Sequence, residues 1–555
     1  MKVSDYIVKF LLNSKIDKIF GVNGGLIEPL LLSAHNKNLE IINCASENQA
    51  ALISQSYGYE NKSFGVCFCV SGAGQSGLIN GISTAFLENK KMIVISGDNN
   101  YNKIKKRSMQ NTSENTGINF SKMIKECSAY SVKITPEDNI VEILNKAIRI
   151  MNETSKPVHI EIPKNIFENK IIDNLNKKTT IKSKKIKKDY LIKFYNIIKE
   201  KNTSFLIADT FKETKTLISI LKISDYFNID IYETPTGKGT IPKTHNNYKG
   251  NFGLFSNSKY KNDGKIKNNN VFIGGSLNEI NTNGWDDHVF NSKTLLITDI
   301  KSNIDEEKNR VGIGILADLD HFFDEFEKFL TLKNIKLKNE INYINENQEE
   351  IKLDLNEKKI KTENLMKYLN NNEKENSISF FDNGSSLVWG VNVWESNPIM
   401  KKDLIQTFRI GIGFSSMGWA IGYSIGAAMA HKEKNIKINC FIGDGSVLMS
   451  SQEIAMFKKY NLNITFIVLN DSSWGMVYHG QKIATNKNFA YELPVCNYKE
   501  YFNACGIEAI RIENNKDLIL KKDLILKNNY KVIDAVIDPY ATPPIYERVN
   551  SLKGD

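Results

Sequence analysis

Two aspartates in the last third of the chain each follow an apolar run at which a strand would end. Asp444 comes after "NCFIG" and Asp471 after "ITFIVLN", and a helical pattern lies between them. In a parallel sheet a strand–helix–strand unit brings both strand ends to one edge, so we expect the two carboxylates to meet there. Carboxylate oxygens are suitable ligands for Mg²⁺, and the N-terminus of the following helix would favour a diphosphate. Gly443 and Gly445 would let the backbone approach that ligand, although the triplet alone also fits a surface turn with a capping acid.

The segment between the two aspartates has signals for each of its elements. Asn439–Ile442 and Ile464–Leu469 are β-prone and apolar, as expected of neighbouring buried strands. Ser450 is followed three residues later by Glu453, which is the spacing of a capping box. We therefore expect the helix to begin near Ser450 and to run through Lys459.

Along the whole chain, short apolar runs alternate with helical stretches, a pattern typical of α/β proteins with parallel sheets. The strand candidates are KIFGV, LEIINC, FGVCFCVSG, KMIVISG, PVHIEIP, SFLIAD, DIYETP, NNVFIGG, TLLITDI, SISFFDNG, INCFIGDG, ITFIVLND and YKVIDAVID. The length predicts three α/β domains, at residues 1–170, 186–335 and 360–555. A Lys-rich stretch around Ile171–Asp189 reads as the linker between the first two domains.

The composition is that of a globular protein rather than of a nucleic-acid or membrane protein. In its 555 residues, 73 Lys and Arg are interspersed with 63 Asp and Glu, so the net charge of +10 does not favour nucleic-acid binding. The seven cysteines form no CxxC pair, and Cys67 and Cys69 lie in an apolar run where packing explains them. Neither a signal-peptide core nor an apolar run long enough for a membrane helix is present, so we expect a cytoplasmic protein.

Several motifs together resemble those of the thiamine-diphosphate-dependent enzymes. The stretch from Gly443 to Asp471 is similar to the family's cofactor motif, with Asp471 where an asparagine is more usual. The other segments that resemble the family are CASENQAALISQSYGYEN, VSGAGQSGLINGISTAF, PVHIEIPKNI, ETPTGKGTIP, SFFDNGSSLVWG, RIGIGFSSMGWAIGYSIGAAMA and WGMVYHGQK. Each match alone has an ordinary structural explanation. They occur, however, in family order across almost the whole chain, and this joint occurrence carries the resemblance.

The resemblance implies a metal and diphosphate site in the last domain. Asp444, Asp471 and the backbone carbonyl of Ser473 would hold Mg²⁺, and the hydroxyl of Ser385 would contact the diphosphate. The other residues of these motifs expected to contact the cofactor are Gly443, Gly445, Ser446 and, in a turn where Ser71-Gly72 replace the family's Gly-Pro, Gly72.

The resemblance also implies how the pyrimidine end of the cofactor is handled. Glu47 would hydrogen-bond a ring nitrogen of the aminopyrimidine and favour its imino tautomer. Met417 would be the wedge that bends the cofactor, and the backbone carbonyl of Ser415 would accept from its exocyclic amine. In this family the cofactor lies between the first domain of one subunit and the last domain of another. The resemblance therefore implies a homodimer or homotetramer.

The reaction implied is decarboxylation of a 2-oxo acid. Gly24-Gly25 and the "GMV" at 475–477 resemble acetolactate synthase and other carboligases, whereas His479-Gly480 replace the Gln-Trp usual in the synthase. We expect a carboligase that acts on pyruvate or a related 2-oxo acid and joins the product to a carbonyl acceptor. A non-ligating decarboxylase that releases an aldehyde is the alternative. The middle domain begins "TSFLIADTF" without a glycine-rich turn, which argues against FAD.

Two other classes of protein fit the sequence less well. A pyridine-nucleotide dehydrogenase would carry GxGxxG after a strand with an acid about 20 residues further on, and we find none so placed. A non-catalytic paralogue or binding module would be expected to lack the glutamate or the metal motif, and both are present.

Overall fold

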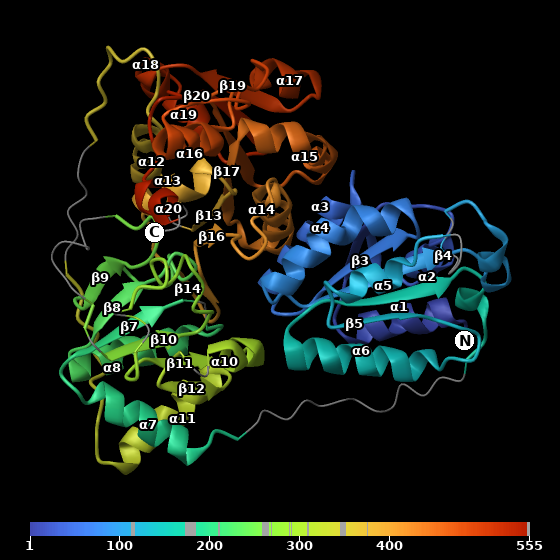
Figure 1. Ribbon diagram of the computed structural model, residues 1–555, viewed down its shortest axis with the longest axis horizontal. Helices are drawn as coiled ribbons and strands as arrows, with labels where there is room; N and C mark the ends of the chain where they lie inside the picture. Colours follow the sequence, from blue (N-terminus) through green and yellow to red (C-terminus); the bar gives the residue numbers. More distant parts are fainter. Residues whose placement is uncertain are drawn as a thin grey trace.

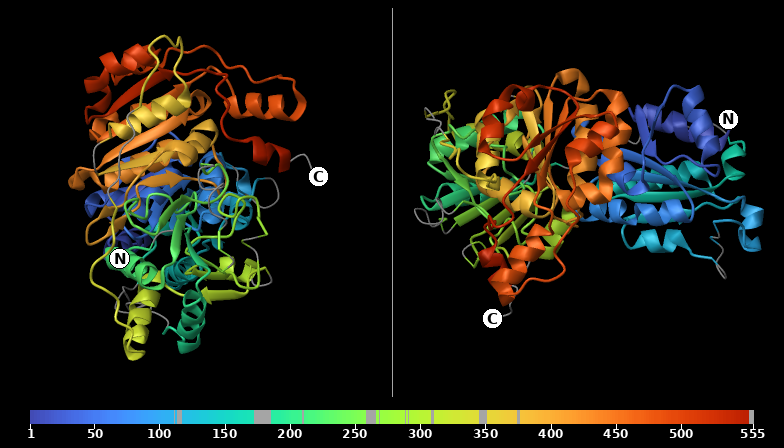
Figure 2. Two further views of the ribbon diagram at one scale, coloured as in Figure 1. Left: turned by 90° about the vertical axis from the view of Figure 1, so that its left-hand side faces the viewer. Right: turned by 90° about the horizontal axis from the view of Figure 1, so that it is seen from above.

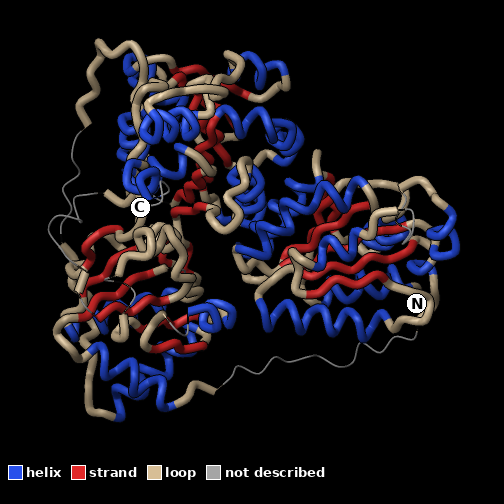
Figure 3. Tube along the Cα trace, in the orientation of Figure 1, coloured by secondary structure: helices blue, strands red, loops and turns tan. Residues whose placement is uncertain are grey.

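The computed structural model describes residues 1–110, 112, 117–171, 185–208, 211–257, 266–267, 269–287, 289, 291–307, 310–344, 351–373 and 376–551. Most of the predicted linker at Ile171–Asp189 lies outside these ranges. The described chain forms three separate six-stranded sheets whose strand pairs are all parallel. Helices pack against each of the three sheets (Figures 1 and 3). The predicted fold class, three α/β domains with parallel sheets, is therefore confirmed.

The N-terminal domain is built on the sheet β2-β1-β3-β4-β6-β5. Its strands are β1 (Lys18–Gly21), β2 (Glu40–Asn43), β3 (Gly65–Val70), β4 (Met92–Asp98), β5 (Tyr130–Lys133) and β6 (Val158–Pro163). Its helices are α1 (Val3–Asn13), α2 (Glu28–Asn36), α3 (Glu47–Glu60), α4 (Ala73–Leu87), α5 (Phe120–Lys125) and α6 (Ile140–Thr154), with 3-10 turns η1 (Tyr101–Lys106) and η2 (Ile166–Glu168). Cys67 and Cys69 are buried free thiols in β3, as packing residues should be.

The central domain is built on the sheet β12-β11-β10-β7-β8-β9. Its strands are β7 (Thr203–Ile207), β8 (Asp230–Glu233), β9 (Tyr248–Asn251), β10 (Asn269–Ile273), β11 (Leu295–Thr298) and β12 (Ile313–Leu316). Its helices are α7 (Lys188–Ile198), α8 (Thr214–Phe227), α10 (Lys301–Glu307) and α11 (Leu319–Leu332). Phenylalanines of α11 and Phe194 of α7 pack edge to face and hold these two helices together.

The C-terminal domain is built on the sheet β16-β13-β17-β18-β20-β19. Its strands are β13 (Ser377–Phe381), β16 (Phe408–Ile410), β17 (Lys437–Gly443), β18 (Ile464–Asn470), β19 (Glu508–Ile512) and β20 (Lys531–Val536), beside a small hairpin of β14 (Ile399–Met400) and β15 (Leu404–Ile405). Its helices are α12 (Thr362–Asn371), α13 (Ser385–Val393), α14 (Trp419–Ala430), α15 (Asp444–Phe457), α16 (Gly475–Thr485), α17 (Tyr498–Ala504), α18 (Asn515–Leu520), α19 (Lys522–Leu526) and α20 (Tyr546–Ser551), with 3-10 turns η3 (Lys432–Lys434) and η4 (Lys458–Tyr460).

Among the described residues, no helix combines the length and apolar composition that crossing a bilayer requires.

The N-terminal and C-terminal domains meet through α3 and α14, and the C-terminal domain also contacts the central one (Figure 2). Glycines make the α3–α14 approach close, since a Cβ at Gly426 would lie 2.4 Å from the carbonyl oxygen of Ile53. Gln49 of α3 donates through Nε2 to the carbonyl of Gly418 and to Ser450 Oγ, at 3.1 Å each. The two domains are therefore joined by hydrogen bonds as well as by apolar packing.

The predicted helix start at Ser450 was wrong. The helix α15 begins at Asp444, directly after β17, so Ser450 and Glu453 lie inside it. Glu453 is fully buried, and its Oε1 accepts from the backbone N–H groups of Ala45 and Ser46, both at 2.8 Å. Ser450 and Glu453, which have the spacing of a capping box, form hydrogen bonds with the N-terminal domain instead.

A buried ionic cluster lies at the same interface. Glu60, at the end of α3, pairs with Arg409 of β16 at 3.0 Å and with His431 Nε2 at 2.9 Å. Burial alone would raise the pKa of this carboxyl, but the charge of Arg409 and the hydrogen bond with His431 outweigh it and lower the pKa to about 2.

The central domain contacts the C-terminal domain through a buried lysine. Lys238 donates through Nζ to the carbonyls of Val391 (2.7 Å) and Gly390 (3.3 Å), in the last turn of α13. Burial lowers the pKa of Lys238 to about 8. The two carbonyls belong to the negative end of the helix, where a cation is stabilising.

Candidate active site

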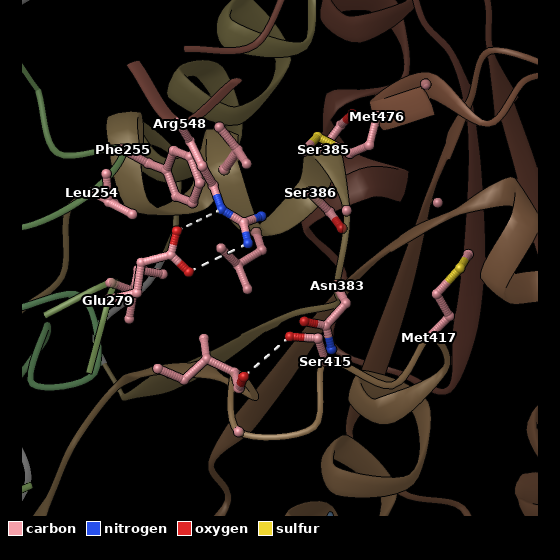
Figure 4. Close-up of a pocket in the computed structure, with 18 of the residues that line it drawn as sticks. Leu254, Phe255, Glu279, Asn383, Ser385, Ser386, Ser415, Met417, Met476 and Arg548 are labelled. Atoms are coloured by element: carbon pink, nitrogen blue, oxygen red, sulfur yellow. Dashed lines mark hydrogen bonds and ion pairs between the residues drawn. The ribbon is translucent and has the colours of Figure 1, made fainter. Parts of the chain in front are cut away.

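A cavity of about 780 Å³ lies at the carboxyl edge of the C-terminal sheet, facing the central domain. It is lined by the first residues of α13, α15 and α16, by the loop before α14 and by residues 254–310 of the central domain. Figure 4 shows Asn383, Ser385, Ser415 and Met417 around this pocket. The strand ends and helix starts that meet here are the usual ligand site of a parallel α/β sheet.

Asp444 and Asp471 lie in this pocket, at the ends of the neighbouring strands β17 and β18. Asp444 accepts from the backbone N–H of Gly445 (2.8 Å) and of Ser472 (2.7 Å), and Asp471 accepts from that of Ser473 (3.1 Å). Burial and the charge of Asp471 raise the pKa of Asp444 to about 7, and burial raises the pKa of Asp471 to about 6. Two carboxylates that repel each other in a buried site favour a cation between them.

The space beside these carboxylates is kept open by a glycine. A Cβ at Gly475 would lie 2.9 Å from Asp471 Oδ2 and 3.3 Å from Ser385 Oγ. The donors on this wall are carboxylate and hydroxyl oxygens, which suit Mg²⁺, and Ser473 lines the same wall. No group of three or more His, Cys, Asp and Glu side chains that could hold a metal occurs in the described ranges, so a metal here would also need backbone and ligand oxygens. The residues present fit a Mg²⁺–diphosphate group.

Three helices point their N-termini into the cavity. Ser385, Asp444 and Gly475 begin α13, α15 and α16 and all line it. Since the N-terminus of a helix carries partial positive charge and free N–H groups, this arrangement favours an anionic ligand such as a diphosphate. Of the neighbouring small residues, Gly443 borders open space, whereas a Cβ at Gly445 would lie 2.3 Å from the ring of Trp474. Gly445 is therefore needed for packing as well.

Another wall of the cavity is the loop before α14, which carries Ser415 and Met417. Ser415 has a φ of +53°, in the left-handed region, and its Oγ donates to the carbonyl of Ile412 at 3.1 Å. Gly418, after Met417, has a φ of +79°. These two positive-φ residues turn the loop so that Ser415 and Met417 both line the cavity.

Asp382 and Asn383 were missed as site residues by the sequence analysis. Asp382 is fully buried and accepts from the backbone N–H groups of Gly418 and Ala420, and from Ser446 Oγ. Asn383 Nδ2 donates to the carbonyl of Ser416 at 2.8 Å. Their position directly before "GSS" could have suggested that they cap the helix that follows, α13. Their hydrogen-bond partners instead lie in another segment of the chain.

Glu279 and Arg548, also missed, both line the cavity, and Figure 4 shows them facing each other. Arg548 Nε lies 3.1 Å from Glu279 Oε1. Arg548 belongs to α20 and Glu279 to the central domain, and the spacing of these residues gives no sequence signal for the pair.

Two predicted site residues, Glu47 and Gly72, do not line this cavity, and neither does any other described residue between 1 and 171. Glu47 begins α3 and lies against the glycine face of α4, since a Cβ at Gly74 or Gly77 would come within 3.2 or 3.0 Å of its carboxylate oxygens. Gly72 has a φ of +74° and caps α4 through its N–H, which donates to Gln75 Oε1 at 3.2 Å. The predicted site is thus divided into two separate half-sites, one on each of two sheet edges.

Comparison with protein families explains this division. The central-domain model of the thiamine pyrophosphate enzymes matches residues 196–326, the N-terminal TPP-binding domain matches residues 1–118 and the C-terminal TPP-binding domain matches residues 382–535. The chain belongs to the thiamine pyrophosphate enzymes. The matches to the two TPP-binding domains contain the residues of the two predicted half-sites: Glu47 and Gly72 in one, and Asp444 with Asp471 in the other.

Relatives among these enzymes extend over nearly the whole chain. It is 25% identical over 577 residues to the "Probable acetolactate synthase large subunit" of Methanococcus aeolicus, covering 97% of this chain and 92% of that protein. It is 23% identical over 526 residues to pyruvate decarboxylase isozyme 3 of Saccharomyces cerevisiae, covering 90% and 89%. The crystal structure of benzoylformate decarboxylase from Polynucleobacter necessarius shares the fold, with a TM-score of 0.79 at 16% identity and coverage of 98% and 99%. The chain is therefore an acetolactate synthase-like thiamine pyrophosphate enzyme.

Proposed function

We propose that this protein decarboxylates a 2-oxo acid, pyruvate or a close relative, and joins the product to a carbonyl acceptor. The observation that carries the proposal is the meeting of Asp444, Asp471 and Ser385 at one sheet edge, beside a cavity that continues toward the central domain. A volume of about 780 Å³ is in the range of pockets that hold drug-sized ligands, which leaves room beside the cofactor for substrates. The long match to an acetolactate synthase large subunit favours carboligation.

The proposed roles of the residues follow from their positions. Asp444, Asp471 and the backbone carbonyl of Ser473 hold Mg²⁺, and Ser385, with the N-termini of α13, α15 and α16, binds the diphosphate. Further contacts to the cofactor come from Gly443, Gly445, Ser446 and, on the other half-site, Gly72. When bound, thiamine diphosphate supplies the carbon nucleophile that adds to the 2-oxo acid and takes up the electrons released as CO₂ leaves.

The pyrimidine half of the site involves two chains in this proposal. Met417 supports the cofactor in its bent form and the carbonyl of Ser415 accepts from the exocyclic amine. Glu47 of a second copy holds a proton at the aminopyrimidine ring nitrogen. This assignment is supported by the absence of the described residues 1–171 from the lining of the chain's own cavity. The enzyme is accordingly a homodimer or a pair of such dimers.

Product analysis tests the proposal. The purified protein is incubated with pyruvate, Mg²⁺ and thiamine diphosphate, and the products are identified by NMR. We expect acetolactate or acetoin. Acetaldehyde alone would contradict carboligation and support the alternative, a non-ligating decarboxylase, which the match to a pyruvate decarboxylase favours. Failure to consume any member of a panel of 2-oxo acids would contradict both.

FAD is not part of the proposed cofactor set. The sequence after β7 reads "ADTF" and provides no glycine-rich turn for a dinucleotide. The absorbance spectrum of the purified holoenzyme tests this, since bound flavin would give a visible band.

A further inference from the structure

The turn at Asp382 and Asn383 holds the loop on both sides of Met417. On one side, Asn383 Nδ2 donates to the carbonyl of Ser416 at 2.8 Å. On the other, Asp382 Oδ2 accepts from the N–H of Gly418 at 2.9 Å, and Oδ1 accepts from that of Ala420 at 2.8 Å. Two consecutive side chains therefore fix the backbone immediately before and after Met417.

Asp382 replaces a cap that α14 cannot provide for itself. The N-cap of α14 is Gly418, which has no side chain to accept from the first N–H groups of the helix. A side chain there is excluded, because Gly418 has a φ of +79° and its Cβ would lie 2.6 Å from Ser450 Oγ. The free N–H groups are instead satisfied by Asp382, whose carboxylate also interacts favourably with the positive end of the helix.

The same carboxylate also reaches the metal half of the site. Ser446, in the first turn of α15, donates through Oγ to Asp382 Oδ2. The helix α15 begins with Asp444, and the chain after Asn383 leads through Gly384 into Ser385, at the start of α13. No ion pair to Asp382 occurs in the described ranges, so its fully buried carboxylate is stabilised by hydrogen bonds and helix ends.

We propose that Asp382, assisted by Asn383, is the positioning residue that sets the distance between the diphosphate cradle and Met417, and so the bend of the cofactor. The inference rests on the proposed function. Asp382 is not a catalytic residue, since it touches backbone N–H groups and Ser446 rather than the cavity. It acts on Met417 through the loop that it holds.

The proposal separates cofactor binding from cofactor activation. Binding is anchored at Asp444, Asp471 and Ser385, whereas activation requires the two cofactor rings to be held against each other. A displacement of about 1 Å at reacting atoms can cost on the order of 10² in rate. In Asp382→Asn, an amide N–H₂ would face the donors at Gly418, Ala420 or Ser446, so at least one of these hydrogen bonds is lost.

Two measurements test the proposal without substrate. Isothermal titration calorimetry of the apoenzyme gives the affinity for thiamine diphosphate with Mg²⁺, and acid-quenched proton NMR of the reconstituted holoenzyme gives the rate of deuterium exchange at the thiazolium C2 position. For Asp382→Asn we expect exchange to slow by about 10²-fold while affinity falls by less than about tenfold. Asn383→Ala, which loses a single hydrogen bond on the other side of Met417, should shift in the same direction by a smaller factor.

Glu373→Gln is the matched control. Glu373 is a largely buried carboxylate of the same domain, paired with Lys437 at the opposite edge of the sheet. We expect it to lower the melting temperature and to leave C2 exchange unchanged. Exchange at the wild-type rate in both site variants would overturn the proposal. A second result would also overturn it. In that result, the cofactor affinity, the C2 exchange rate and the melting temperature of Asp382→Asn all fall together, while Asn383→Ala keeps the wild-type exchange rate. Absence of cofactor binding by the wild-type protein would instead overturn the proposed function.

Discussion

The carboxylate of Glu453 accepts a hydrogen bond from the backbone N–H of Ser46 at 2.8 Å. Glu453 belongs to α15, the helix that starts at Asp444, and Ser46 is the N-cap of α3, the helix that starts at Glu47. This hydrogen bond therefore links the proposed metal half-site to the proposed glutamate half-site of the same chain, although the two do not share a cavity. Two copies, each contributing one half, would complete two sites.

Mixing two inactive variants distinguishes shared sites from sites within one chain. In a heterodimer of Glu47→Gln with Asp444→Ala, one site receives the intact Glu47 and the intact Asp444, and the other receives both substitutions. After random exchange of subunits, half of the dimers have one good site, so we expect about a quarter of wild-type activity. The measurement is activity after unfolding or dissociating and reassembling equal amounts of the variants. If Glu47 served its own chain's cavity, the mixture would stay inactive.

Asp444→Ala taken alone should abolish retention of the cofactor that depends on Mg²⁺. The substitution removes one of two carboxylates that face each other, which leaves Asp471 as the remaining carboxylate ligand. Calorimetric titration with thiamine diphosphate, with and without Mg²⁺, measures this. Unchanged affinity in the presence of Mg²⁺ would refute the ligand role.

Glu47→Gln should separate binding from turnover. Since Glu47 lies apart from the metal half-site, the variant is expected to bind the cofactor nearly as the wild type does. Its turnover should fall by roughly 10² or more, because an amide cannot hold and return the proton. Steady-state kinetics and calorimetry on the same preparation give both quantities, and near wild-type turnover would show that the assignment of Glu47 is wrong.

Gly475→Ala should weaken cofactor binding by filling the space between two side chains. The new methyl group would lie 2.9 Å from Asp471 Oδ2 and 3.3 Å from Ser385 Oγ, where we place the metal and the diphosphate. We expect an affinity loss of about tenfold or more, which corresponds to about 1.4 kcal/mol or more. Gly480→Ala is the matched control in the same helix, since its Cβ would meet no atom within 4 Å. Equal affinities in the two variants would contradict this account of the pocket.

Acid should remove the contribution of Glu60 to stability. The pKa of Glu60 is lowered from 4.5 to about 2 in the folded protein, so its stabilising effect is complete above pH 4.5 and is lost as the pH falls toward 2. Glu60→Gln should cost about 3 kcal/mol near neutral pH, because it removes the carboxylate of a buried ion pair with Arg409. The difference between wild type and variant in urea unfolding, followed by tryptophan fluorescence, should shrink between pH 4.5 and pH 2.

The surface pair of Asp189 and Lys193 provides the comparison for Glu60. Both side chains are largely exposed, so Asp189→Asn should change the unfolding midpoint little at any pH. A pH dependence of the same size in Asp189→Asn and Glu60→Gln would contradict a specific role for the buried cluster.

The interior of each sheet could be predicted from the sequence, whereas the edges mostly could not. The strands that apolar patterning missed in the three sheets, β5, β9, β12, β16 and β19, are all edge strands. The interior strand β18 is buried at every residue, but β5 is half-buried throughout and β12 is buried at a single residue. An edge strand has a neighbour on one side and shorter apolar runs, so the pattern that marks a buried strand is weak there.

In the site, residues with local motifs could be predicted and residues with distant partners could not. Asp444 and Asp471 follow strands that pair directly, so chain order alone places them at one edge. Asp382 bonds to Gly418 and Ala420, 36 and 38 residues further along, and no spacing rule connects them. The same limit explains the error at Ser450 and Glu453, whose partners belong to the N-terminal domain.

Lys238 connects the central domain to the helix that begins with Ser385, even though we assign this domain no ligand of the metal or diphosphate. Its ammonium group donates to carbonyls at the C-terminal end of α13, and the N-terminal residue of the same helix, Ser385, lines the pocket. The central domain therefore helps to hold this helix in place. A chimera with the central domain of another enzyme would need a cationic side chain at the position of Lys238. With a neutral side chain there, we expect α13 to be held less rigidly.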